Sequence, residues 1–181
     1  MEHKGTVTIE TDRLILRKVE LCDVKNLTEL LKDKDVQDFL AGIPENYTEE
    51  MAVSYISNKL EKSYNKEDYY DWAVVEKETN KLIGRIGLFK QDDERMMADL
   101  VWYINKESRG KGYIPEAVKE IIKLLQSVGY KRIEAFANVK NKASQRVMEK
   151  CGFSFEGTLK KYDLDREGNL YDANMFSIVC D

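Results

Sequence analysis

The sequence is poor in the residue types on which several kinds of site depend. Among 181 residues there are three cysteines, two prolines and a single histidine, His3, near the start of the chain. Zinc chemistry and Ser-His or Cys-His nucleophiles are therefore poor candidates. Cys22, Cys151 and Cys180 are far apart and odd in number. They show neither metal-ligand spacing nor a disulfide framework, which favours a reducing compartment.

Long apolar runs are missing too. No stretch could span a bilayer, and the N-terminal residues lack the apolar core of a signal peptide, so we expect a cytoplasmic protein without membrane contact. The net charge of −4 lacks the basic footprint of a general nucleic-acid binder. With 43% hydrophobic and 34% charged residues and no Pro-, Gly- or Ser-rich linker, residues 1–181 are expected to form one domain.

Hydrophobic periodicity predicts a mixed α/β fold. Alternation, as in Leu14 and Leu16, indicates a strand, and apolar residues at helical spacing indicate a helix. The expected strands cover 11–19, 70–77, 82–89, 98–104, 131–138, 153–164 and 170–179. The expected helices cover 23–34, 48–60, 113–128 and 142–151.

Capping and turn residues refine these boundaries. Asp23 can cap the first helix, Thr48 opens the second, and 41–47 should be a loop because it contains Gly42 and Pro44. The buried stripe of the second helix is expected at Val53, Ile56 and Leu60, and one face of the last helix at Ala143, Val147 and Cys151. The order of elements predicts a sheet of about seven strands flanked by about four helices.

A glycine-containing loop at 107–114 (ESRGKGYI) joins a strand to a helix. Gly110 and Gly112 allow a tight turn and a close approach to a ligand, while Arg109 and Lys111 add positive charge. Unpaired backbone N–H groups at the start of a helix suit a pyrophosphate. A plain helix N-cap turn explains the same pattern. The loop has neither the Gly-Lys-Ser/Thr of the P-loop nor the third glycine of a Rossmann fingerprint.

A second motif lies at 138–153 (NVKNKASQRVMEKCGF). Asn141 is a good N-cap, and Gly152 is a natural residue to follow the helix. By itself, a capped amphipathic helix accounts for this stretch.

Together, in this order and at this separation, the two motifs resemble the GNAT superfamily of N-acetyltransferases. The stretch 109–113 (RGKGY), followed by Glu-Ala, looks like its acetyl-CoA pyrophosphate loop. The Asn-x-x-Asn-x-x-Ser pattern before Gly-Phe is similar to the Rim-type branch, named for enzymes that acetylate ribosomal-protein N-termini. With 11–17 (TDRLILR), the resemblance covers essentially the whole chain. This sequence departs from the family pattern at Ile114, where a small residue is usual, and at Met148, where many members have a tyrosine.

The resemblance implies a mostly antiparallel sheet whose central strands, 98–104 and 131–138, splay apart to receive the pantetheine arm of acetyl-CoA. Exposed backbone in the first of these strands would bond the arm as an added strand does, and an N–H there would polarise the thioester carbonyl. The implied acetyl-CoA contacts are Trp102, Tyr103, Ile104, Arg109, Gly110, Lys111, Gly112, Tyr113, Ile114, Asn138 and Asn141.

Direct acetyl transfer needs a neutral amine and a proton for the departing thiolate. Asp99 stands where the family often carries a glutamate base, although a carboxylate at this point is commonly a solvated strand end. Aspartate is shorter than glutamate, which favours a water relay. The Rim-type branch implies Ser144 as the acid, where a plain helical serine is the simpler interpretation. Tyr103 and Tyr162 remain as other donors.

The expected function is acetyl transfer from acetyl-CoA to a primary amine, either a protein N-terminal amine or a small molecule. Segment 34–47 and the turn at 165–169 are expected to line the acceptor site. The alternative is a non-catalytic acyl-CoA-binding sensor module. A nucleotide-binding domain is a third hypothesis, which the loop spacing disfavours. Similar proteins are commonly homodimers, and only that analogy supports a homodimer here.

Overall fold

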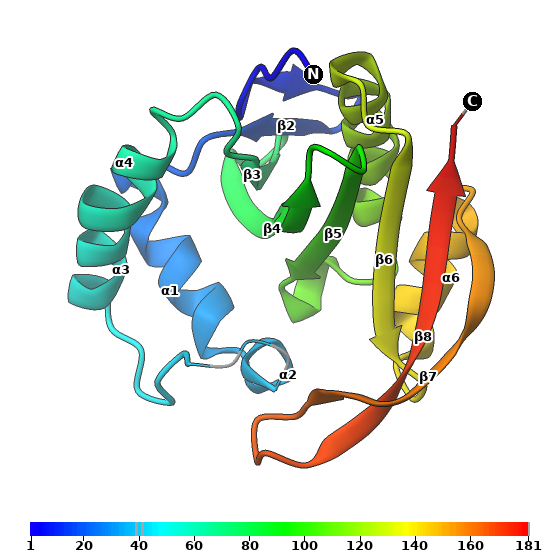
Figure 1. Cartoon of the computed structure of the whole chain (residues 1–181). Helices are drawn as coiled ribbons and strands as arrows, with labels where there is room; N and C mark the ends of the chain where they lie inside the picture. Colours follow the sequence, from blue (N-terminus) through cyan, green and yellow to red (C-terminus); the bar gives the residue numbers. More distant parts are fainter. Residues whose placement is uncertain (39, 41, 181) are drawn as a thin grey trace. The chain divides into compact units, whose positions relative to one another are not determined.

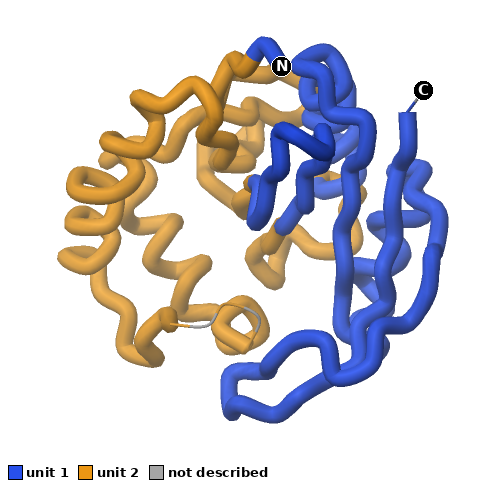
Figure 2. Tube along the Cα trace, in the orientation of Figure 1, with its two compact units in different colours: residues 1–2, 88–101, 114–181 blue, residues 3–87, 102–113 orange. Residues whose placement is uncertain are grey.

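The computed structural model describes residues 1–38, 40 and 42–180 and divides the chain into two compact units. Unit 1 comprises Met1–Glu2, Leu88–Val101 and Ile114–Asp181, and unit 2 comprises His3–Gly87 and Trp102–Tyr113 (Figure 2). The chain passes between the units after Glu2, within two strands and at the start of one helix.

Eight strands are found in the described chain, one more than predicted, in the order β1-β2-β3-β4-β5-β6-β8-β7 (Figure 1). Of the pairs with a described register, β5–β6 is parallel and the others are antiparallel, which confirms a mixed, mostly antiparallel sheet. The bounds are β1 Ile9–Glu10, β2 Leu14–Arg17, β3 Asp71–Glu76, β4 Lys81–Asp92, β5 Met97–Ile104, β6 Arg132–Asn138, β7 Ser154–Leu164 and β8 Leu170–Val179. The extra strand is β1, which is too short to leave a periodic signal.

The early helical part of unit 2 is more broken than predicted. Its described helical segments are the 3₁₀ turn η1 Leu21–Asp23, α1 Val24–Lys32, α2 Lys34–Gln37, α3 Glu49–Tyr55, the π-helix η2 Ile56–Leu60 and α4 Glu61–Ser63. Thr48 caps α3 as expected, because its hydroxyl accepts a hydrogen bond from Met51 N at 3.3 Å. Gly42 to Tyr47 lies in a loop as predicted, and Ala41 is outside the described residues.

The predicted role of Asp23 as the cap of α1 is wrong. Its side chain makes no capping bond to that helix. Instead it accepts from Glu20 N at 2.9 Å and pairs through both oxygens with Arg17, at 2.7 and 2.9 Å. A buried carboxylate gains more from a bidentate guanidinium than from one backbone N–H, because both of its oxygens are then paired.

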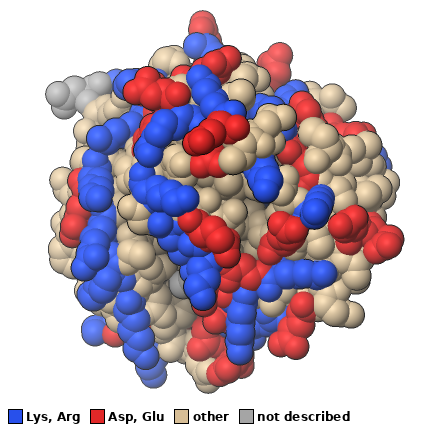
Figure 3. All heavy atoms as spheres, turned by 180° about the vertical axis from the view of Figure 1, so that it is seen from behind, with Lys and Arg blue, Asp and Glu red and all other residues tan. Residues whose placement is uncertain are grey.

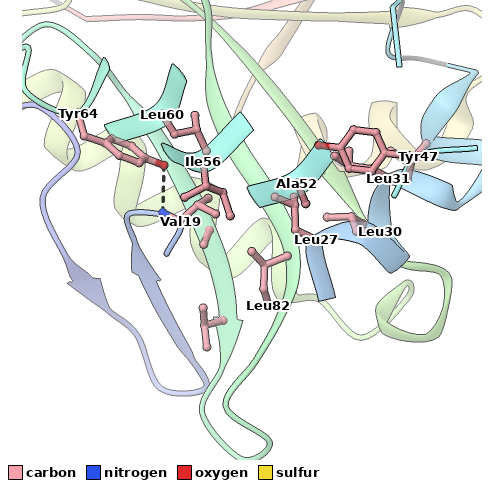
Figure 4. Packing of buried hydrophobic residues seen from close by; sticks show 13 residues of the cluster. Val19, Leu27, Leu30, Leu31, Tyr47, Ala52, Ile56, Leu60, Tyr64 and Leu82 are labelled. Atoms are coloured by element: carbon pink, nitrogen blue, oxygen red, sulfur yellow. Dashed lines mark hydrogen bonds between the residues drawn. The ribbon is translucent and has the colours of Figure 1, made fainter. Parts of the chain in front are cut away.

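The core of unit 2 packs helical side chains against the strands. The hydroxyl of Tyr64 accepts a hydrogen bond from Val19 N at 3.0 Å within this core (Figure 4). The predicted stripe of the second helix is correct at Ile56 and Leu60 but wrong at Val53, which is exposed, while Ala52 is fully buried. Ala52, Ile56 and Leu60 follow one another at four-residue intervals and so share a face, from which Val53 is rotated by one residue.

Unit 1 places its two helices against one face of its strands. These are α5 Tyr113–Val128, whose first residue belongs to unit 2, and α6 Lys142–Lys150. All the apolar residues of α5 expected from the sequence are buried: Ile114, Ala117, Val118, Ile121, Leu125 and Val128.

The predicted face of α6 is wrong. Ala143 is exposed and Val147 is half-buried, whereas Gln145 and Met148 are buried. Gln145 turns inward because its amide donates to the carbonyls of Asn138 and Val139, at 3.2 and 3.1 Å. A polar residue therefore occupies part of the buried stripe, which hydropathy could not indicate.

The surface carries both signs of charge. Figure 3 shows lysine and arginine side chains beside aspartate and glutamate, with uncharged residues between them. In the described chain, no helix is both long enough and apolar enough to cross a membrane.

Candidate active site

The glycine-containing loop keeps its backbone N–H groups available. After the 3₁₀ turn η3 (Lys106–Ser108), Gly110 and Gly112 have φ of 76° and 81°, in the left-handed region that favours glycine. Within the described chain, the N–H groups from Gly110 to Tyr113 donate no hydrogen bond. Free N–H groups at the beginning of a 16-residue helix form the backbone arrangement that binds a phosphate.

The side chain of Arg109 anchors the loop. Its guanidinium lies 2.8 Å from Asp33 and 2.5 Å from Asp35, and its Nε donates to the carbonyl of Ile104 at 3.3 Å. Both aspartates belong to the junction between α1 and α2. The positive charge expected to face an anion is therefore already paired with two carboxylates.

Two residues outside the predicted set shape this loop. Arg13 donates to the carbonyl of Lys111 at 3.0 Å, and its guanidinium lies 4.5 Å from the centre of the Tyr113 ring. The hydroxyl of Tyr113 bonds in turn to Glu76. Sequence reasoning gave no role in the loop to Arg13, although it lies in the 11–17 stretch, or to Glu76, because each is far from the loop along the chain.

The end of β5, from Trp102 to Ile104, lies against Gly84 in unit 2. A Cβ at Gly84 would be 2.6 Å from the carbonyl oxygen of Tyr103, closer than real Cβ atoms approach. This close approach of two backbones is possible only because residue 84 is a glycine. The Tyr103 side chain is turned toward the buried Arg85, with which it shares a hydrogen bond.

Asp99 lies at the point where two central strands of unit 1 stop pairing. The parallel register joins Met97, Ala98 and Asp99 with Arg132, Ile133 and Glu134, and among the described residues of unit 1 it goes no further. The family resemblance implies that the strands splay at this place.

Burial changes the acid–base behaviour of Asp99. The residue is 6% exposed, and no described donor bonds its carboxylate. Burial, and next the facing carboxylate of Glu134, raise its pKa to about 7, while Lys90 acts in the opposite direction. A carboxylate with such a pKa is half deprotonated at neutral pH, which suits a general base. The alternative of a solvated strand end does not fit a buried residue.

Asp99 and Ser144 lie on opposite faces of the unit 1 sheet. Asp99 shares its face with Glu134, its partner in register. The other face carries the side chain of Asn174, whose amide donates to Gln145 of α6 at 3.2 Å. Ser144 belongs to this same helix, so its hydroxyl reaches the gap between the strands only from the helical side.

The asparagines of the second motif hold the turn before α6. Asn141 accepts from Ser144 N at 3.1 Å, which confirms the expected N-cap, and Asn138 accepts from Lys140 N at 2.9 Å. No described partner bonds the Ser144 hydroxyl. Ile114 and Met148, the two departures from the family pattern, are 5% and 0% exposed, so both side chains belong to the core.

The family model of the acetyltransferase (GNAT) domain matches residues 13–154, most of the chain. The chain belongs to the GNAT acetyltransferase family. A GNAT acetyltransferase is an enzyme that transfers an acetyl group to an amine, and this much of the expected function is confirmed.

Relatives of this GNAT chain share its full length. An uncharacterised N-acetyltransferase, p20, of Bacillus licheniformis is 30% identical over 176 residues, covering 95% of this chain and 96% of the relative. A GNAT-family acetyltransferase structure from Bacillus anthracis is 26% identical with a TM-score of 0.80, covering 96% of this chain and 98% of that one. A ribosomal-protein-S5-alanine acetyltransferase structure from Vibrio fischeri has a TM-score of 0.83 at 20% identity, covering 97% of each chain. This last likeness shows the fold.

Proposed function

We propose that this enzyme transfers the acetyl group of acetyl-CoA directly to a primary amine, with Asp99 as the general base. One observation carries the proposal: Asp99 is a buried carboxylate with a pKa of about 7, at the end of the β5–β6 register. A non-catalytic acyl-CoA sensor does not need such a group. Family membership also favours the enzyme over the sensor.

Acetyl-CoA suits the chemistry of the loop. The unpaired N–H groups of Gly110, Lys111, Gly112 and Tyr113 bind its pyrophosphate in this proposal, with the start of α5 behind them. Arg109 acts by fixing the loop, and Ile114 offers only its backbone. The backbone of Trp102, Tyr103 and Ile104 bonds the pantetheine, as an added strand would. Asn138 and Asn141 contribute by shaping the start of α6.

The transfer step balances with two proton movements. Asp99, directly or through water, takes a proton from the ammonium of the acceptor, and the neutral nitrogen attacks the thioester carbonyl carbon. The new N–C bond forms, the C–S bond breaks, and the second proton of the nitrogen replaces the one that the acid gives to the sulfur, while Asp99 releases its proton to water. The thiolate takes up one proton, for which Ser144 is the proposed donor, with Tyr103 and Tyr162 as alternatives. The products are an acetamide and free CoA.

The acceptor amine, the cellular location and the oligomeric state are proposed in less detail than the reaction. A protein N-terminal amine is suggested by the fold shared with the ribosomal-protein acetyltransferase, and a small-molecule amine is equally compatible with the family. A cytoplasmic location and a homodimer remain proposals from the sequence.

Thermal unfolding with acetyl-CoA, CoA, ATP or NAD tests the co-substrate. A ligand at 100 times its Kd stabilises the folded state by about 2.7 kcal/mol, which raises Tm by roughly 5–10 °C in a chain of this size. We expect such a shift with acetyl-CoA and CoA alone, followed by CoA release when amines are added. Unchanged melting with both CoA species would refute the proposal.

Gly112→Ala is expected to weaken acetyl-CoA binding about tenfold, measured by calorimetry. An L side chain at φ 81° costs about 1–2 kcal/mol, so the loop moves its N–H groups away from the bound geometry. Gly157→Ala is the matched control, because a Cβ there meets nothing within 4 Å and its φ is outside the left-handed region. Equal affinities of the two variants would contradict the role of the loop.

Ser144→Ala is expected to lower kcat by at least about tenfold with little change in acetyl-CoA affinity, because a proton donor acts on the leaving group. Steady-state kinetics and calorimetry separate the two quantities. Ser154→Ala, at an exposed serine of β7, should change neither. A loss of affinity with normal kcat would make Ser144 a co-substrate contact instead of the acid.

A further inference from the structure

Three aromatic side chains from three strands of unit 1 form a continuous row. The ring centres of Phe89 on β4 and Phe136 on β6 are 6.5 Å apart, and those of Phe136 and Tyr162 on β7 are 5.0 Å apart, each pair meeting edge to face. Phe89 is 65% exposed and Tyr162 is 44% exposed. Large aromatic rings are usually withdrawn from water, so a row with two open ends offers an apolar surface to a ligand.

The row lies on the same face of the sheet as Asp99. Phe136 is two residues from Glu134 along β6, and Glu134 is the register partner of Asp99, so all three side chains share that face. Burial first, and then the carboxylates of Asp99, Glu134 and Asp163, raise the pKa of Tyr162. The opposite face bears the side chains of Ala135 and Phe176, which are buried.

An irregularity in β7 accompanies the position of Tyr162. The register of β7 with β8 shifts between Leu159 and Asp163, and Lys161 has φ 48°, which is unusual for a residue other than glycine. Asp172 holds this conformation by accepting from Lys161 N at 2.9 Å and from Lys160 Nζ at 2.8 Å. Bulges of this kind re-aim side chains and are frequent beside active sites.

Among the described residues of this face, Asp99 is the carboxylate that neither a cation nor a hydrogen-bond donor holds. Glu134 pairs with Arg132 at 2.8 Å, and Arg132 also holds Glu156 at 2.6 Å. Asp163 accepts from the hydroxyl of Tyr171 at 3.0 Å and from Leu164 N at 2.8 Å. Lys90 of β4 acts on Asp99 from a distance but makes no ion pair with it among the described residues. The face therefore suits a ligand with a single positive charge near Asp99.

We propose that Phe89, Phe136 and Tyr162 form the acceptor subsite and that the preferred acceptor is a small arylalkylamine, a primary monoamine with a flat apolar group a few bonds from its nitrogen. The ring of the acceptor packs on the aromatic row while its amine reaches Asp99. This inference rests on the proposed function and gives its substrate class. Phe89 and Phe136 select the acceptor by contact alone, and Tyr162 adds its ring to the same row.

The test compares kcat/KM for 2-phenylethylamine and butylamine with saturating acetyl-CoA. In the wild-type enzyme we expect a preference for 2-phenylethylamine of at least about tenfold. Phe89→Ala should lower kcat/KM for 2-phenylethylamine roughly 5–20-fold, mostly through KM, and change that for butylamine less than about twofold. Phe155→Ala is the matched control: Phe155 is 56% exposed, and its ring lies 5.3 Å from that of Phe176, which belongs to the other face. This variant should leave both values unchanged.

Different failures of this experiment have different meanings. Turnover of amines with no preference for 2-phenylethylamine, or the same loss in both variants, overturns the subsite but keeps the acetyltransferase. A preference for spermidine or for an Ala-Gly-Gly peptide over 2-phenylethylamine overturns the substrate class. If acetyl-CoA neither stabilises the protein nor is consumed with any amine, the proposed function itself is wrong.

Discussion

Asp99→Asn is expected to lower kcat roughly 10²–10⁴-fold, the usual contribution of a positioned general base. Asparagine keeps the size of the side chain and removes its ability to take a proton from the ammonium. The measurement is steady-state CoA release with a good acceptor amine. Asp12→Asn, at an exposed aspartate before β2, is a control with the same chemical change and should retain most of the activity.

The pH profile identifies the group more sharply. Since the pKa of Asp99 is about 7, kcat/KM of the wild-type enzyme should rise with pH through 7 as this carboxyl loses its proton. In Asp99→Asn this rise should disappear, leaving only the titration of the amine itself. A variant with wild-type turnover at every pH would remove Asp99 from the mechanism.

The stability of Asp99→Asn shows whether a loss of activity could result from misfolding. The pKa of Asp99 is higher in the folded protein than the usual value near 3.9 in an unfolded chain, so the folded state binds the proton more tightly. This contribution to the free energy of unfolding is complete below about pH 4 and is lost as pH rises through 7. Asparagine has no charge to bury. At pH 8 the variant should therefore be more stable than the wild type, by at most ~4 kcal/mol.

Asp71→Ala is expected to lower the free energy of unfolding by about 3–5 kcal/mol and Tm by roughly 10 °C. The carboxylate of Asp71 bonds the guanidinium of Arg85, which is 4% exposed, and also accepts from the hydroxyl of Tyr69 at 3.2 Å. Arg85 also bonds the hydroxyl of Tyr55 at 3.2 Å and the side chain of Tyr103, and its Nε is buried with no partner among the described residues. Removing Asp71 leaves a charge in the core that no neighbour neutralises.

A double-mutant cycle separates this charge effect from lost packing. Asp71→Ala with Arg85→Leu removes both charges, so the double variant should be more stable than Asp71→Ala alone. Glu120→Ala is the control, because Glu120 forms an exposed ion pair with Lys123, and it should change stability by less than about 1 kcal/mol. Urea unfolding measures the four proteins of the cycle and the control. If the changes in free energy of unfolding of the two single variants add up to that of the double variant, the interaction between Asp71 and Arg85 contributes nothing to stability.

Local patterns in the sequence predicted most of the elements. The helix over 113–128 has the predicted bounds, and its six apolar positions are buried. Over 16 residues the apolar positions all fall on one side of the helix, so only that side can face the core. The face of α6 was predicted wrongly because hydropathy does not register Gln145, a polar residue that backbone carbonyls satisfy inside the protein. The buried position was predicted at Val53 but lies one residue earlier, at Ala52. Adjacent apolar residues in this helix allow either position to be assigned to the buried face.

The sequence by itself determined the family, the strand and helix order, and the glycine loop with its two positions of positive φ, because these depend on neighbours along the chain. The tertiary structure alone decided which groups the site can use. Arg109 is tied to Asp33 and Asp35, Asp99 is buried opposite Glu134, and the aromatic row is assembled from three strands. Each of these depends on residues distant in sequence that folding brings into contact. Burial and charge pairing, and with them the pKa of a base, exist only after those contacts form.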